Sequence, residues 1–116
     1  MSTRLPGAKY KRVFDRGRSM KGRLLVAWYL TAEDADRQAG VIVSKRSFRH
    51  AVDRNRAKRL MREAYRLLAG EGAVPEKTEW IFIGRSRLGG CRVRDVVEDI
   101  RALCKRLPGG SQPAVR

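Results

Sequence analysis

The chain has 116 residues and a formal net charge of +15, from 27 Lys and Arg against 12 Asp and Glu. This length suffices for one domain with its own core and is too short for two. Such an excess of positive charge calls for a polyanionic partner, of which nucleic acid is the leading candidate. No apolar run approaches the roughly 20 residues of a membrane-spanning helix, and the first residues lack a secretory signal. We therefore expect a cytoplasmic protein with no membrane partner.

The first half of the chain predicts one helix followed by two strands. Residues 7–16 form a short amphipathic stretch that Gly17 would end as a C-cap. Residues 24–30 predict a strand that is nearly apolar on both faces, so either both faces are covered or one forms a ligand platform. Residues 40–44 predict the returning strand of a hairpin, and the polar segment 31–38 predicts the connection between the two.

The second half predicts a long helix, a strand and a final helix. Residues 51–69 give the clearest helical pattern, ended by glycines at 70 and 72. Residues 80–83 predict a strand, and residues 93–107 predict a helix with an apolar stripe. We predict a compact single domain over residues 1–107, a disordered tail over 108–116, and an α+β fold with the helices packed on one face of a small sheet.

The long helix separates basic and apolar side chains. Successive residues of a helix advance by about 100°. The basic side, about 140° wide by that rule, carries Arg54, Asn55, Lys58, Arg59, Arg62 and Arg66, with Arg56 at its border. The opposite side carries Ala57, Leu60, Met61, Ala64, Leu67 and Leu68. This division predicts one face in the core and one face of positive charge.

Most such charged faces are simply solvated. Here residues 45–66 hold nine basic residues but only two acids, Asp53 and Glu63, so the bases repel one another. Arginine dominates, and its planar fork suits two-point contacts with phosphate. Asn55 is a poor helix former whose amide could contact a base edge or a ribose. We therefore favour a polyanion-binding face.

A second basic cluster lies near the N-terminus. Residues 4–23 hold eight basic residues and one acid, with Tyr10 and Phe14 among them and Trp28 following on the first strand. Aromatic rings beside cations are typical of single-stranded RNA binding, where bases stack and cations follow the backbone. We expect Val13 to lie in the core, whereas for Phe14 and Trp28 core and ligand roles remain equally open.

Residues with catalytic or metal-binding chemistry are sparse. Cys91 and Cys104 make no metal motif with the single histidine, His50, and we expect reduced thiols with Cys104 in the core. A lone histidine without a partner in sequence reach is a poor candidate for a general base. We predict no catalytic residue and no metal site in the protein.

The stretch from Val41 to Arg46, followed by the stretch from Ala51 to Arg66 with its Arg54-Asn55-Arg56 triplet, resembles the signature of the ribonuclease P protein family. The resemblance covers residues 4–106. It implies an α+β domain ordered helix-strand-strand-(strand)-helix-strand-helix, with a left-handed crossover around the basic helix. The family's sheet has four strands, whereas three strand-like runs are visible here. The segment 48–50 departs from the family pattern, because His50 stands where an asparagine would cap the helix better.

The resemblance implies a protein that binds the catalytic ribonuclease P RNA, expected 1:1, and assists removal of the 5′ leader from precursor tRNA. The RNA and its bound Mg²⁺ would carry the chemistry, so the protein alone should be inert. The residues that would face the catalytic RNA are Ser44, Lys45, Arg46, Arg54, Asn55, Arg56, Lys58, Arg59, Arg62 and Arg66. The residues that would hold the leader are Tyr10, Phe14 and Trp28, with Lys9 and Arg12 beside them.

Two other functions use the same residues. A structural ribosomal or general nucleic-acid-binding protein would need the +15 charge but no aromatic cleft. A stand-alone nuclease would need metal ligands or a nucleophile, and no carboxylate pair, nucleophile elbow or phosphate loop is visible in the sequence.

Overall fold

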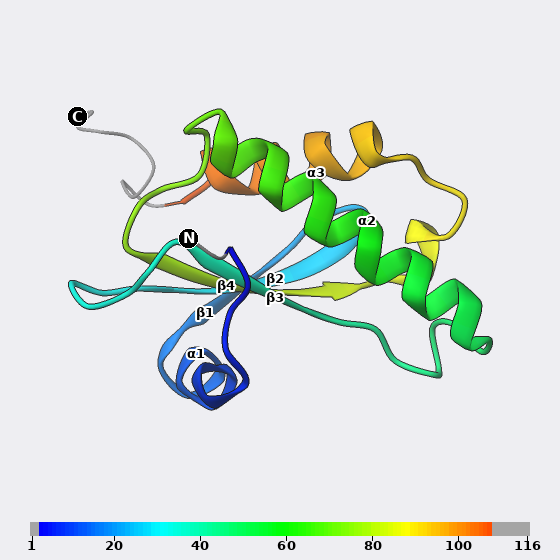
Figure 1. Ribbon diagram of the computed structural model, residues 1–116, viewed down its shortest axis with the longest axis horizontal. Coiled ribbons are helices and arrows are strands. Elements are labelled where there is room, and N and C mark those ends of the chain that lie inside the picture. The colour runs from blue at the N-terminus through cyan, green and yellow to red at the C-terminus, as the bar shows by residue number, and fades with distance from the viewer. Residues whose placement is uncertain (1–2, 108–116) are drawn as a thin grey trace.

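The computed structural model describes residues 3–107, which form a four-stranded mixed sheet and three α-helices (Figure 1). The predicted tail at 108–116 lies outside the described residues. In chain order the elements are the 3-10 turn Gly7–Lys9, α1 Tyr10–Arg16, β1 Arg18–Lys21, β2 Leu25–Thr31, β3 Gln38–Ile42, α2 Ala51–Gly70, β4 Thr78–Gly84, the 3-10 turn Ser86–Leu88, and α3 Val93–Lys105.

The strands lie in the order β1-β2-β4-β3, so the predicted hairpin between β2 and β3 is wrong. β4 inserts between them, antiparallel to β2 and parallel to β3. Its central residues Trp80, Ile81 and Phe82 are fully buried. A strand in the middle of the sheet can bury both of its faces. The free energy gained by this burial outweighs the lower entropy cost of closing a local hairpin. The helix α2 then forms the crossover between the parallel neighbours β3 and β4.

The fourth strand, β1, was not visible in the sequence. Three of its four residues are exposed, and only Met20 is half-buried. It pairs antiparallel with β2, with Ser19 opposite Trp28. An edge strand that faces water needs no apolar alternation, so its pattern could not reveal it.

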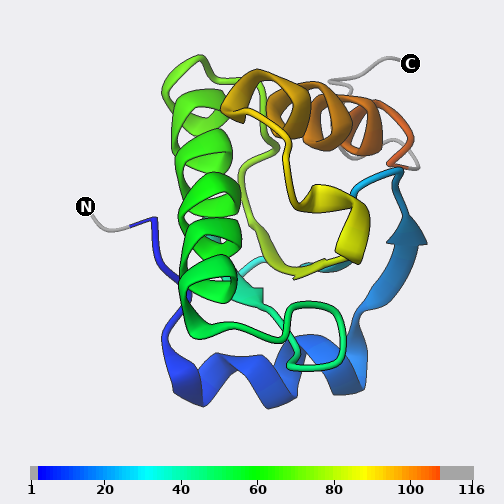
Figure 2. The same ribbon diagram turned by 90° about the vertical axis from the view of Figure 1, so that its right-hand side faces the viewer.

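The helices cover both faces of the sheet, contrary to the one-sided packing that the sequence predicted. In Figures 1 and 2, α2 and α3 lie on one side of the sheet and α1 on the other. Two apolar clusters fill the two layers. The larger lies under α2 and α3, and the smaller is built on Val13, Leu30 and Ile81 beneath α1.

This two-sided packing explains the doubly apolar pattern of β2. Leu25, Ala27 and Tyr29 belong to the cluster under α2 and α3, while Trp28 and Leu30 belong to the cluster under α1. Successive side chains of the strand thus pack alternately into two different apolar clusters, one on each face of the sheet. Of the two interpretations left open by the sequence, coverage of both faces is the one observed, although Val26 and Trp28 remain half-buried.

The long helix follows its predicted bounds closely. It begins at Ala51 after an extended His50 that makes no side-chain cap, and it ends at Gly70. Gly72 adopts φ +74°, a conformation that glycine tolerates without strain, and its amide donates to the carbonyl oxygen of Ala69. The apolar side is buried as predicted except for Leu67, which is 40% exposed.

Candidate nucleic-acid interface

The basic face of α2, defined as Arg54, Asn55, Lys58, Arg59, Arg62 and Arg66, points away from the core. Asn55, Arg59, Arg62 and Arg66 are exposed, and Arg54 and Lys58 are half-buried. On the other side of the helix Ala57, Met61, Ala64 and Leu68 are almost completely buried. The apolar side anchors the helix, and its 3.6-residue period keeps the cations together on the opposite side.

Two members of the Arg54-Asn55-Arg56 triplet also hold the fold. Nη1 of Arg54 donates to the carbonyl oxygens of Phe48 and Arg49, each at 3.0 Å, and so fastens the loop that leads into α2. Nη2 of Arg56 donates to the carbonyl oxygen of Cys91 at 2.7 Å, across the gap to the segment before α3. Their remaining N–H groups stay available for phosphate, because a guanidinium carries five donors.

The cations at the centre of the face have no such partners. Within residues 3–107, neither Arg59 nor Arg62 forms an ion pair, whereas Arg66 is paired with Glu63 at 2.6 Å. Uncompensated cations on one helix face raise the local positive potential, which favours a polyanion.

A groove of about 510 Å³ runs between this face, β3 and the N-terminal segment. It brings Arg4, which is 58 positions before Arg62 in the chain, to the basic face. Burial and the nearby charge of Arg4 lower the pKa of Arg62, while Tyr10 acts on it in the opposite direction. No local pattern could have signalled Arg4, because a bridge to Ala39 on β3 positions it.

Ser44, Lys45 and Arg46 are exposed in the loop between β3 and α2. The hydroxyl of Ser44 accepts a hydrogen bond from the amide of Ser47 at 3.1 Å, which shapes the turn. The two cations therefore extend the positive surface beyond the start of α2, while Ser44 is already engaged.

The aromatic residues that the sequence singled out gather on the smaller core. Phe14 on α1 and Trp28 on β2 meet edge to face, with ring centroids 5.3 Å apart. Both rings and Tyr10 are half-buried against the smaller core, while Val13 is fully buried as predicted. Tyr10 packs directly over Gly40 of β3, where any larger side chain would collide with its ring. The three aromatic residues thus pack against the smaller core and remain partly exposed.

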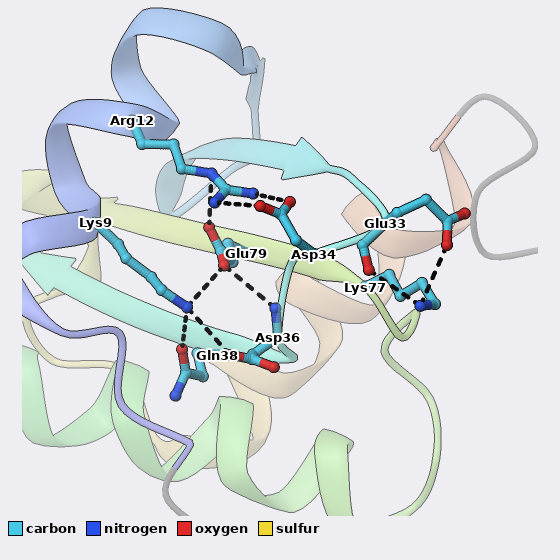
Figure 3. A network of polar contacts seen from close by, with 8 residues as sticks. All are labelled: Lys9, Arg12, Glu33, Asp34, Asp36, Gln38, Lys77 and Glu79. Carbon is cyan, nitrogen blue, oxygen red and sulfur yellow. Dashed lines mark hydrogen bonds and ion pairs between the residues drawn. The ribbon is translucent and has the colours of Figure 1, made fainter.

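Lys9 and Arg12, predicted beside the leader, are engaged in a network with acids (Figure 3). Its centre is Glu79 on β4, a fully buried carboxylate that lies 3.2 Å from Nζ of Lys9 and 3.7 Å from Nε of Arg12. Asp36 contacts Lys9 at 3.1 Å, and Asp34 contacts Arg12 at 2.6 Å. The hydrogen bond from Lys9 to Asp36 raises the pKa of Lys9, and the bond from Arg12 lowers the pKa of Asp34.

This network fastens α1 to the sheet and neutralises two cations that the sequence had left without partners. The acidic segment 33–36 was visible in the sequence, but its pairing with α1 was not. The carboxylate of Glu79 also accepts a hydrogen bond from the amide of Asp36, at 3.2 Å. The charges of Lys9 and Arg12 are therefore largely compensated within the fold, unlike those of Arg59 and Arg62 on α2.

The described part of the chain has few residues that could bind a metal ion or act as a nucleophile. No group of three or more His, Cys, Asp or Glu side chains there could hold a metal ion. His50 is exposed at the start of α2, and both cysteines are reduced thiols, Cys104 buried and Cys91 half-buried. No helix in residues 3–107 is both long and apolar enough to cross a membrane.

Comparison with known proteins gives one consistent result. The family model described as Ribonuclease P matches residues 5–108. A ribonuclease P protein component from Pelotomaculum thermopropionicum is 38% identical over 97 residues, 84% of each chain. The one from an Exiguobacterium species is 35% identical over 98 residues, 84% of this chain and 82% of its own. The solved RNase P protein from Thermotoga maritima has a TM-score of 0.75 at 24% identity, covering 91% of this chain and 98% of that one. This last likeness confirms the predicted α+β fold.

Proposed function

Because the chain belongs to the ribonuclease P protein family, we propose that it binds ribonuclease P RNA through the basic face of α2 and holds the 5′ leader of precursor tRNA against the aromatic cluster. A ribonuclease P protein component is a subunit of a ribonucleoprotein endoribonuclease that processes tRNA, with ribonuclease P RNA as its partner. The individual contacts, the metal requirement and a 1:1 stoichiometry are parts of the proposal.

The observation that carries the proposal is the uncompensated charge of α2. Arg59 and Arg62 are exposed on one face and form no ion pair within residues 3–107. Lys45 and Arg46 continue the positive surface into the preceding loop. Such a surface gains affinity for a phosphate backbone by releasing counterions, with an affinity that falls steeply as salt rises.

The leader would lie on the α1 side of the sheet. Tyr10, Phe14 and Trp28 each expose part of a ring there, and single-stranded RNA binds by stacking its bases on such rings. Because Lys9 and Arg12 are paired with acids, the rings would contribute more to leader binding than these two cations.

Mg²⁺ belongs to the RNA in this proposal. No group of three His, Cys, Asp or Glu side chains that could hold a metal ion occurs among residues 3–107, and the proposal assigns the ion to the RNA. The protein's part is to neutralise phosphate charge and to orient RNA and substrate. Mg²⁺ bound by the RNA would supply the hydrolytic chemistry, so the protein alone should not cleave.

The test adds purified protein to a bacterial ribonuclease P RNA at low Mg²⁺ and follows cleavage of a precursor tRNA. We expect a clear gain in rate over RNA alone and no cleavage by protein without RNA. No gain would contradict the proposal. Binding that ignores leader length and RNA identity would instead favour a general nucleic-acid-binding protein, and cleavage by protein alone would favour a stand-alone nuclease.

A further inference from the structure

The groove beside α2 combines an apolar floor with a cationic rim. Ala39 and Val41 of β3 and Met61 of α2 line it, and all three belong to the main core. Its volume of about 510 Å³ lies within the range of small-molecule sites, which is about 300–1,000 Å³. A phosphate backbone alone needs cations and no apolar floor, so this floor suggests that something other than phosphate enters.

The rim carries an excess of positive charge. Arg4, Arg59 and Arg62 line it, and its one acid, Glu63, is paired with Arg66. Arg4 and Arg62 are close enough for the charge of Arg4 to disfavour the protonated form of Arg62. Because both side chains line the groove, an anion there would meet positive charge from two distant segments of the chain.

Two polar side chains of the groove could form hydrogen bonds with a ligand. Tyr65 lines the groove and is only 2% exposed, and its hydroxyl has no hydrogen-bond partner within the described part of the chain. A buried hydroxyl without a partner is costly, and a ligand that supplies one removes the cost. Asn55 adds an exposed amide, which can donate and accept at a base edge.

We propose that this groove takes one unstacked nucleotide of ribonuclease P RNA, with its base on the floor of Ala39 and Val41 and its phosphate near Arg4 and Arg62. The inference rests on the proposed function and refines it. Single-stranded and bulged RNA can present such splayed bases, and their recognition pairs stacking or apolar contact with hydrogen bonds to the base edges. The aromatic cluster on the α1 side remains the site for the leader.

The first experiment titrates the full-length protein with adenosine 5′-monophosphate, ribose 5-phosphate and inorganic phosphate, and follows the methyl signals of Ala39 and Val41 by NMR. Saturable shifts are expected with the nucleotide and much smaller shifts with the two probes that lack a base. Equal shifts with all three probes would overturn the proposal, because the floor would then have no role.

The second experiment fills the floor with Ala39→Leu and uses Ala102→Leu, on the exposed side of α3, as the matched control. We expect Ala39→Leu to abolish the base-dependent shifts and to weaken ribonuclease P RNA binding about five-fold, because the larger side chain would occupy the space of the base. Ala102→Leu should change neither. A folded Ala39→Leu protein that binds the nucleotide like the unmodified protein overturns the inference.

If the Ala39→Leu protein fails to fold, the Tyr65→Phe protein tests whether the groove binds a nucleotide. Removing the unpartnered hydroxyl should leave the melting temperature equal or higher, yet weaken nucleotide binding several-fold. Unchanged nucleotide affinity would overturn the inference. Failure of the unmodified protein to bind ribonuclease P RNA would contradict the proposed function instead, whereas RNA binding that survives Ala39→Leu unchanged would contradict only the groove.

Discussion

Arg54 and Arg59 lie on the same face of α2 and carry the same charge, but their surroundings give them different roles. Arg54 fastens the loop before the helix through two carbonyl oxygens, each 3.0 Å from its Nη1. Arg59 has no hydrogen bond or ion pair with residues 3–107. Replacing each by alanine removes one positive charge from the basic face of α2, and only Arg54→Ala should also destabilise the fold.

The expected magnitude follows from the two bonds of Arg54. A net contribution of roughly 0.5–1.5 kcal/mol for each, taken at the low end because the side chain is half-buried, gives a loss of about 1–2 kcal/mol. For a domain of this size that loss corresponds to a drop in melting temperature of roughly 4–8 °C. Arg59→Ala should shift the melting temperature by less than about 2 °C, because surface substitutions usually change the stability by less than about 0.5 kcal/mol.

Thermal unfolding and RNA binding separate the two roles. Affinity for ribonuclease P RNA, measured from low to moderate salt, should fall for both variants, and the salt slope should drop by about one unit for each phosphate that is no longer neutralised. Arg54→Lys is the matched control, since it keeps the charge but cannot span both carbonyl groups with a rigid fork. It should retain most of the salt slope and lose part of the stability.

The refuting result is specific. A melting temperature for Arg54→Ala within about 2 °C of the unmodified protein would mean that the loop bonds contribute no more than an ordinary surface side chain does. An unchanged salt slope for Arg59→Ala would mean that the centre of the basic face does not contact phosphate.

Three further outcomes are expected. Glu79→Gln should lower the free energy of unfolding in urea by about 2 kcal/mol, because the buried carboxylate that two half-buried cations share is lost, whereas Glu33→Gln in an exposed pair should change it by less than about 0.5 kcal/mol; equal effects would contradict the network. Phe14→Ala should weaken binding of leader-containing precursor tRNA roughly ten-fold, because stacking worth about 1–3 kcal/mol is removed, and leave mature tRNA unaffected; equal losses on both would make Phe14 a core residue only. Burial raises the pKa of Cys104 to about 12, so iodoacetamide at pH 8 should modify Cys91 and spare Cys104 in the folded protein. Since the unfolded thiol loses its proton near pH 9, the stability from Cys104 is complete below that pH and is lost as pH rises toward 12; rapid labelling of Cys104 at pH 8 would contradict its burial.

The candidate site divides into residues that the sequence could identify and residues that it could not. Asn55, Arg59 and Arg62 were predictable because a helix places residues three and four apart on one face, whatever surrounds it. Val13 was predictable as core for the same reason. Arg4 and Tyr65 were missed because their role depends on β3 running beside α2, a contact between distant segments.

The order of the strands shows the same limit. The apolar runs of β2, β3 and β4 were recognisable one by one, but a short polar connection suggested that β2 and β3 pair. The placement of β4 between them depends on which strand gains most from burial on both faces, and that comparison involves the whole sheet. The polar edge strand β1 lacked even a local pattern.

Local sequence was enough to define the basic helix, its apolar back and the family resemblance, because charge and helical period are properties of neighbouring residues. Which cations remain without an acidic partner depended instead on the packing of distant segments. Lys9 and Arg12 are neutralised by Glu79, which lies 70 positions after Lys9 in the chain. Arg62 instead lies near Arg4 and forms no ion pair within residues 3–107. The physical reason is that ion pairing depends on distance in space, and chain packing alone brings these charges within a few ångströms of one another.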